Sequence, residues 1–248
     1  IDLIFVYPED GDTDGGRSIS NFEYFTRVGK ALINAIAEIT GDGQVFRVDM
    51  RLRPNGDSGP LACSFEMLEN YFITQGREWE RYAWIKARPL TGTRWEDLEA
   101  IRRPFVFRKY LDFGTINAMR DLHAQIRREV AKKDMANNVK LGPGGIREIE
   151  FIAQVFQLIR GGRDRALQVK PTLEVLKLLV DRSQLELDAV VELSAAYRFL
   201  RRLEHRLQYL DDAQTHSLPG NATDQALIAR AMGFGSYAAL LAELDDHR

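Results

Sequence analysis

Residues 45–54 constrain the fold of this chain most, because apolar and charged side chains alternate along them. From Val48 to Arg53 each apolar residue is followed by a charged one. This period of two predicts a β-strand that projects all of its charged side chains to one face. The charged residues on that face are Arg47, Asp49, Arg51 and Arg53. Mixed charges on a solvated edge strand would give the same pattern, so this segment alone does not decide between a solvated edge strand and a functional site.

A second apolar segment, residues 1–7, changes the balance between these interpretations. It contains one charged residue, Asp2, and no other charge occurs before Glu9. An unpaired carboxylate in an apolar strand is costly, so Asp2 needs a partner or a metal. If the two segments are neighbouring strands, Asp2 and Asp49 form a site with the oxygen ligands that Mg²⁺ or Mn²⁺ prefers. The arginines beside Asp49 would then be available for phosphate.

Composition excludes several classes of protein. The 34 Lys and Arg residues are balanced by 36 Asp and Glu residues, which gives a net charge of −2 and argues against a nucleic-acid partner. Cys63 is the single cysteine, so an intrachain disulfide and a cysteine-based zinc site are both excluded. No run of 18 apolar residues is present, and we expect no membrane partner and a cytoplasmic location.

Two domains are expected. Residues 1–104 contain both strand and helix patterns, with helices over 20–38, 64–75 and 79–88, and form an α+β domain. The first of these helices begins at Ser20 or Asn21, and its apolar face covers a sheet. Residues 105–248 form an all-α helical bundle. Its helices are predicted over 105–134, 144–160, 172–181, 188–212, 223–232 and 236–246.

Two helices of the predicted bundle carry narrow polar stripes. Helix 144–160 places Arg147, Glu150, Gln154 and Gln157 on one line. Helix 188–212 does the same with Arg198, Arg201, His205, Gln208 and Asp212. The stripes are either an internal polar network that fixes the bundle register, or the wall of a cleft that receives phosphate, a modified protein or a regulator. His205 is not expected to bind metal, because the other histidines lie on unrelated segments.

Several stretches resemble a known enzyme family. Residues 1–5 look like the end of the Gly-Ser-Asp-x-Asp signature of polymerase-β-type nucleotidyltransferases. Val48 to Pro54 resembles the third-carboxylate strand of one branch, the bifunctional glutamine synthetase adenylyltransferase/adenylyl-removing enzymes. Further stretches similar to that family are Gly76 to Arg88, Gly144 to Phe151 and Phe199 to Gln208. The family carries two similar nucleotidyltransferase copies, and the stretches at 79–88 and 144–151 look like the N-terminal, adenylyl-removing copy.

The resemblance implies a fold and a reaction. Residues 1–104 would be part of a polymerase-β-like nucleotidyltransferase domain, with Asp2 and Asp49 as the catalytic, metal-binding carboxylates. In the implied reaction, inorganic phosphate attacks adenylyl-tyrosine on glutamine synthetase and releases ADP and free tyrosine. The resemblance also implies a PII-type signalling protein as regulator, received by the helical domain. The residues expected to hold phosphate, ADP or ATP are Arg51, Arg53, Lys86 and Arg88.

Other functions stay open. A solvated helix face explains Lys86 and Arg88 equally well. The same chemistry could run as ATP-dependent adenylylation, or as uridylylation of a PII-type protein. The chain could also be a non-catalytic module that binds glutamine synthetase or a signalling protein. The family's first signature aspartate would precede Ile1 and is not in this sequence, so we expect the 248 residues alone to have little or no activity.

Overall fold

The computed structural model describes residues 1–109, 124, 135, 137–210 and 214–248. The chain divides into two compact units, Ile1–Arg108 and Lys109–Arg248. The division lies beside residue 104, where the sequence pattern places the end of the first domain.

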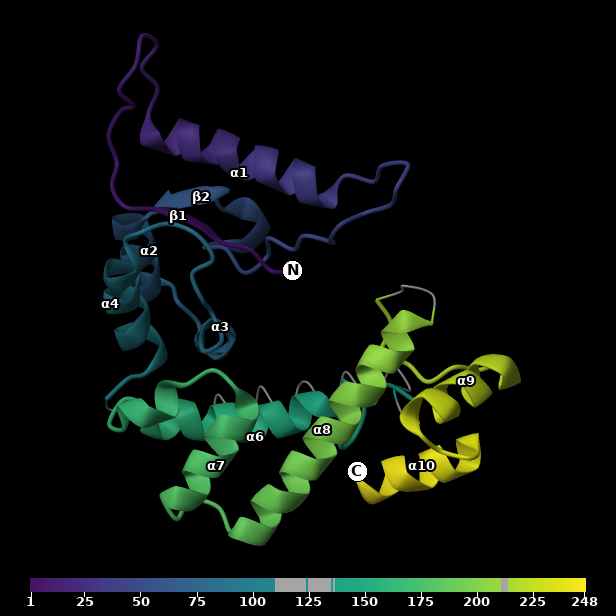
Figure 1. The fold of residues 1–248 in the computed structure, drawn as a ribbon. Helices are drawn as coiled ribbons and strands as arrows, with labels where there is room; N and C mark the ends of the chain where they lie inside the picture. The colour runs from purple at the N-terminus through teal and green to yellow at the C-terminus, as the bar shows by residue number, and fades with distance from the viewer. Residues whose placement is uncertain (110–123, 125–134, 136, 211–213) are drawn as a thin grey trace. The chain divides into compact units, whose positions relative to one another are not determined.

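Unit 1 combines a small sheet with helices and is therefore α+β, as predicted. Strand β1 (Phe5–Tyr7) pairs in parallel with β2 (Ala62–Ser64), and Val6 lies opposite Cys63. Helix α1 (Asn21–Ala37) runs along this pair of strands (Figure 1). It approaches closely at Gly29, where an added Cβ would lie 3.1 Å from the ring of Phe5. The sequence pattern did not predict β2, because a strand this short has no readable period.

The prediction of a continuous strand over residues 45–54 is wrong. Its strand pairing is limited to an isolated parallel bridge between Asp49 and Asp2. The chain turns directly afterwards, because the amide of Arg53 donates to the carbonyl of Met50. Pro54 has no amide to donate to a sheet, and Asn55 adopts a positive φ of 61°, which a strand does not allow. Phe46, expected in the strand, is 55% exposed.

The helices of unit 1 were predicted in part. Ser20 caps α1 and Ser64 caps α2 (Phe65–Thr74), each accepting a hydrogen bond from a backbone amide three residues on, as expected. Helix α3 (Glu78–Trp84) is shorter than the predicted 79–88, so the predicted site residues Lys86 and Arg88 follow it. A short 3₁₀ helix, η1, occupies Gly56–Ser58.

Helix α4 (Trp95–Val106) was not predicted, although Trp95, Leu98 and Ile101 recur at helical spacing. Residues 105 and 106 complete this helix, so the predicted helix start at residue 105 is wrong. Most of the predicted helix 105–134 lies outside the described residues. Two buried arginines tie α3 and α4 together. Arg81 donates to the carbonyls of Phe105 and Val106, and Arg102 donates to the carbonyl of Trp84.

Unit 2 is helical, with one core. Its elements are α6 (Ile146–Arg160), the 3₁₀ helix η2 (Arg165–Gln168), α7 (Thr172–Asp181), α8 (Leu187–Tyr209), α9 (Ala222–Met232) and α10 (Tyr237–Asp246). These bounds confirm the predicted helices, except that the end of predicted helix 188–212 reaches residues 211–213, which lie outside the described ones. Leucines of α7 and α8, among them Leu176, Leu179, Leu200 and Leu203, are fully buried in the core.

Within the described part of the chain, no single helix is long and apolar enough to cross a membrane. Only the pair α9 and α10, which is bent by 62° at the break between the two helices, reaches that length and apolar composition when taken together.

Candidate functional site

Asp2 and Asp49 lie next to each other in space. The amide of Asp49 donates to the carbonyl of Ile1 at 2.8 Å, and the amide of Leu3 donates to the carbonyl of Asp49 at 3.0 Å. These two bonds pair Asp2 with Asp49 in a parallel bridge. Paired residues of neighbouring extended segments project their side chains to the same side. The local pairing therefore brings the two predicted carboxylates together, although the strand that was expected to carry Asp49 did not form.

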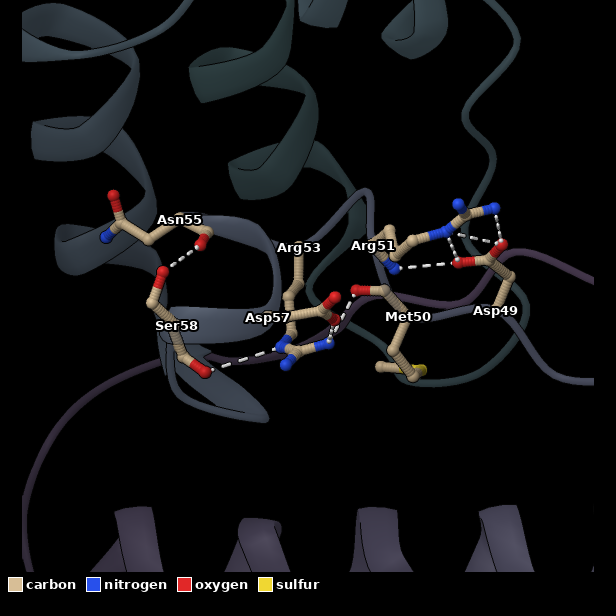
Figure 2. A network of polar contacts seen from close by, with 8 residues as sticks. Asp49, Met50, Arg51, Arg53, Asn55, Asp57 and Ser58 are labelled. Carbon is tan, nitrogen blue, oxygen red and sulfur yellow. Dashed lines mark hydrogen bonds and ion pairs between the residues drawn. The ribbon is translucent and has the colours of Figure 1, made fainter.

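Asp49 is held by Arg51. Its carboxylate accepts a hydrogen bond from the backbone amide of Arg51 at 2.9 Å, and from Nε and Nη2 of the guanidinium at 3.0 Å and 2.5 Å (Figure 2). These bonds, first those from the Arg51 side chain, lower the pKa of Asp49 to about 2, and the charge of Arg47 adds to the effect. Asp49 is therefore ionised at neutral pH.

Several carboxylates act on Arg51 in turn. Its pKa is raised, mainly by the hydrogen bond with Asp49, and the charges of Asp57 and Asp2 contribute. The Arg51 side chain is 72% exposed, so a surface ion pair of this kind can open at little cost. The sequence pattern assigned Arg51 to phosphate, but in this structure its guanidinium binds the carboxylate instead.

Arg53 has a different environment from Arg51. Its side chain is 13% exposed, donates to the carbonyl of Met50 at 2.8 Å and lies 3.5 Å from Asp57 (Figure 2). These contacts fix the loop that follows Asp49. The prediction that Arg51 and Arg53 share one face of a strand is wrong, because the turn at residues 51–55 separates them. Arg53 supports the loop in this structure.

Lys86 and Arg88 follow helix α3, where Lys86 is half-buried and Arg88 is exposed. Arg47, which was predicted on the strand but not assigned to the site, contributes a positive charge near Asp49. The role of Lys86 and Arg88 in nucleotide binding stays a prediction.

The donor set of Asp2 and Asp49 fits a hard divalent cation in part. Two carboxylates on the same side supply the oxygen ligands that Mg²⁺ prefers. Among the described residues, however, no group of three or more Asp, Glu, His or Cys residues could hold a metal ion. Both carboxylate oxygens of Asp49 also accept hydrogen bonds from Arg51, so a cation would have to displace that guanidinium.

In unit 2, the polar stripe of α6 is mainly an internal network. Gln157 is buried and donates to the carbonyls of Leu167 and Val169, which anchors the segment around η2. Glu150 accepts a hydrogen bond from the Tyr197 hydroxyl at 3.1 Å, which connects α6 with α8. Gln154 is also buried, whereas Arg147 is exposed. For this helix the structure supports the interpretation as a network that fixes packing.

The stripe of α8 lies at a groove instead. Arg198 and His205 are exposed, Arg201 is half-buried, and all three line an open groove of about 530 Å³. Gln208 is half-buried and does not line the groove, and Asp212 lies outside the described residues.

Glu204 was not predicted as a site residue, and it is buried at 2% exposure. Its carboxylate accepts a hydrogen bond from Arg201 at 2.6 Å and lies 3.5 Å from Lys140. His216 Nδ1 is 3.1 Å away but is not aligned for a hydrogen bond, and burial lowers the pKa of His216. The signal in the sequence was a carboxylate on the apolar face of the helix, next to Leu203.

Comparisons with known proteins relate both units to enzymes that modify proteins with nucleotides. Residues 1–102 match the family model for glutamate-ammonia ligase adenylyltransferase, and residues 120–248 match the family model for PII-uridylyltransferase. Bifunctional glutamine synthetase adenylyltransferase/adenylyl-removing enzymes match the whole chain. The Aromatoleum aromaticum enzyme is 72% identical, the Chromobacterium violaceum enzyme 63% and the Nitrosomonas europaea enzyme 60%.

The chain spans 26%, 28% and 27% of the length of these relatives, respectively. Identity at this level over all 248 residues confirms the resemblance seen in the motifs. The chain therefore belongs to the family of bifunctional glutamine synthetase adenylyltransferase/adenylyl-removing enzymes.

Proposed function

We propose that this chain is the adenylyl-removing part of such an enzyme. In the proposed reaction, an oxygen of inorganic phosphate forms a bond to the phosphorus of adenylyl-tyrosine on glutamine synthetase. The bond from that phosphorus to the tyrosine oxygen breaks, ADP leaves, and the tyrosine oxygen takes a proton from solvent. The observation that carries the proposal is the pairing of Asp2 with Asp49 on the same side of two neighbouring segments.

Asp2 and Asp49 are the residues that would hold Mg²⁺ or Mn²⁺. When bound, such an ion neutralises charge on the phosphates during in-line displacement. The low pKa of Asp49 supports this role, because the carboxylate is ionised without having to lose a proton first. Phosphate is already an anion, so the reaction needs no general base from the protein.

Arg51 has two partners in this proposal. It neutralises Asp49 in the structure described here, and it binds phosphate or ADP once a cation takes its place on the carboxylate. The exposure of its side chain supports this exchange, since no packing is lost when the guanidinium moves. Lys86 and Arg88 are proposed to contact nucleotide or phosphate from the segment after α3.

The proposed partners are adenylylated glutamine synthetase and a PII-type signalling protein, and the proposed location is the cytoplasm. The relatives are named as enzymes that act on glutamine synthetase, which supports glutamine synthetase as substrate. The match of residues 120–248 to the PII-uridylyltransferase model keeps one alternative open, nucleotide transfer to a PII-type protein.

The test is made in an enzyme of full length that contains this chain. Asp49→Asn is compared with the unchanged enzyme in two assays, release of ADP from adenylylated glutamine synthetase with phosphate, and incorporation of AMP from ATP. We expect ADP release to fall at least about 100-fold, since carboxylates that hold catalytic metal are essential, while AMP incorporation is retained. Loss of AMP incorporation with ADP release intact would instead assign adenylylation to this segment. Retention of both activities, with no Mn²⁺ binding, would favour a non-catalytic module.

A further inference from the structure

The groove on α8 presents four guanidinium groups from one face of one helix. Arg198, Arg202 and Arg206 follow each other at intervals of four residues, and Arg201 lies beside them. Residues at this spacing are neighbours on a helix surface. No acidic side chain lines the groove within the described part of the chain. The groove is made only of unit 2 residues, so the inference does not depend on the proposed function.

Helix stability does not explain this arrangement. Like charges four residues apart repel and destabilise a helix. A cation near the helix C-terminus is favourable, but that effect is confined to the last turn, where Arg206 lies. Among the described residues, neither Arg198 nor Arg206 has an ion-pair partner. The array therefore carries repulsion that a bound anion would relieve.

Two of the arginines are held in position by other parts of unit 2. Arg201 donates from Nη1 to the buried carboxylate of Glu204 at 2.6 Å. Arg202 donates from Nη2 to the carbonyl of Met232, at the end of α9, at 3.0 Å. A guanidinium has five N–H donors, so each keeps donors for a ligand. Arginines fixed in this way lose less conformational entropy when they bind.

The rest of the groove wall is aromatic and aliphatic. Tyr197 is half-buried and its hydroxyl is bonded to Glu150, so its ring is fixed. Tyr209 lines the same groove and is 74% exposed, and Leu173 of α7 contributes an aliphatic surface. Ring faces of this kind stack on nucleic-acid bases.

We propose that this groove binds a phosphate-bearing ligand of nucleotide size, with the arginines on the phosphates and the aromatic wall on the base. The volume of about 530 Å³ falls in the range of small-molecule sites, which is roughly 300 to 1,000 Å³. An arginine guanidinium can donate two parallel hydrogen bonds to two oxygens of one phosphate, and several arginines can share the oxygens of a phosphate group. This arrangement favours phosphate over a single carboxylate.

The proposal is tested by calorimetric titration of the 248-residue chain with ADP in the presence of EDTA. EDTA removes metal-dependent binding at Asp2 and Asp49, and the groove variant separates the groove from the cationic residues of unit 1 in the binding that remains. Adenosine, inorganic phosphate and a poly-glutamate peptide are titrated in parallel. The groove variant is the pair Arg198→Ala and Arg206→Ala. Its control is the pair Arg160→Ala and Arg230→Ala, which removes the same charge from exposed positions on α6 and α9.

We expect ADP to bind at least about tenfold more tightly than adenosine or phosphate, because both parts of the groove contribute. The groove pair should weaken ADP binding at least about tenfold and the control pair less than about twofold, since exposed arginines elsewhere act only through net charge. Arg198→Lys with Arg206→Lys should restore part of the binding, because lysine restores the positive charge but cannot donate the paired hydrogen bonds of a guanidinium.

A local signal separates binding in the groove from binding elsewhere. The imidazole proton resonances of His205, assigned by comparison with His205→Gln, should shift on addition of ADP, because His205 lines the groove. Thermal unfolding of the groove pair should not occur at lower temperature than that of the unchanged chain, because removing like charges relieves repulsion. ADP binding that is absent in EDTA, insensitive to the groove pair, or replaced by tighter binding of poly-glutamate would overturn the proposal.

Discussion

Arg81→Met should destabilise unit 1 strongly. Arg81 is completely buried, and its guanidinium donates to the carbonyls of Phe105 and Val106 at 2.9 and 3.0 Å. It also pairs with Glu78. Methionine fills much of the same space but donates no hydrogen bond, so the substitution leaves two carbonyls at the end of α4 without these donors.

The magnitude follows from those two carbonyls. Leaving a buried acceptor unsatisfied costs about 1 to 3 kcal/mol, so the two together cost roughly 2 to 6 kcal/mol. Glu78 adds less, because it is partly exposed and Arg108 lies 3.4 Å from its carboxylate. We expect a loss of about 4 kcal/mol in the free energy of unfolding, a large part of the roughly 5 to 15 kcal/mol of a typical domain.

The assay is urea unfolding followed by tryptophan fluorescence. All three tryptophans of the chain, Trp79, Trp84 and Trp95, lie in unit 1, so the signal reports unit 1 alone. Circular dichroism at 222 nm follows both units. The control is Arg27→Met, whose side chain is 65% exposed, and which should cost at most about 0.5 kcal/mol. A loss below about 1 kcal/mol for Arg81→Met would refute the reasoning that these bonds hold α3 against α4.

Three further perturbations test other parts of the structure. Arg51→Met should raise the pKa of Asp49 from about 2 towards 3.8, measured by NMR titration. The stabilisation that the low pKa gives to the folded state is complete above about pH 4 and decreases as the pH falls towards 2. The stability of the variant should not show this decrease between pH 4 and 2. Gly59→Ala should destabilise the loop after Asp49, because an added Cβ would lie 1.9 Å from the carbonyl oxygen of Pro54, and unit 1 should unfold at lower urea. Glu204→Leu should cost unit 2 about 1.5 to 3 kcal/mol, because Arg201 loses the charged acceptor of its hydrogen bond while both cations stay partly solvated. Loss of helical circular dichroism at lower temperature would show it.

The helices of unit 2 could be predicted because each carries its own period and its own end signals. Helix α7 ran over the predicted residues, and α9 ends at Gly233, whose φ of 90° suits glycine. The small sheet could not be predicted in the same way. Strand β2 is three residues long, and its position depends on pairing with β1, which is far away in the sequence.

The segment around Asp49 shows how a correct contact can follow from an incorrect element. The alternation from Val48 to Arg53 predicted a strand, but the turn after Met50 takes Arg51 and Arg53 out of it. The pairing with Asp2 survives because it needs only the amide and carbonyl of Asp49. Partners of side chains, such as Arg51 on Asp49, depend on the turn and could not be read from spacing.

Arg51 supplies positive charge beside the two carboxylates of the paired segments. Two carboxylates that lie close together repel each other when both are ionised, and this repulsion normally raises the pKa of one of them. Here the pKa of Asp49 is low instead, because the Arg51 guanidinium supplies the positive charge. A divalent cation that replaces Arg51 would keep the sum of charges favourable. In the proposed function, this exchange would leave Asp49 ionised throughout and would free the guanidinium for phosphate only once the carboxylates have another positive partner.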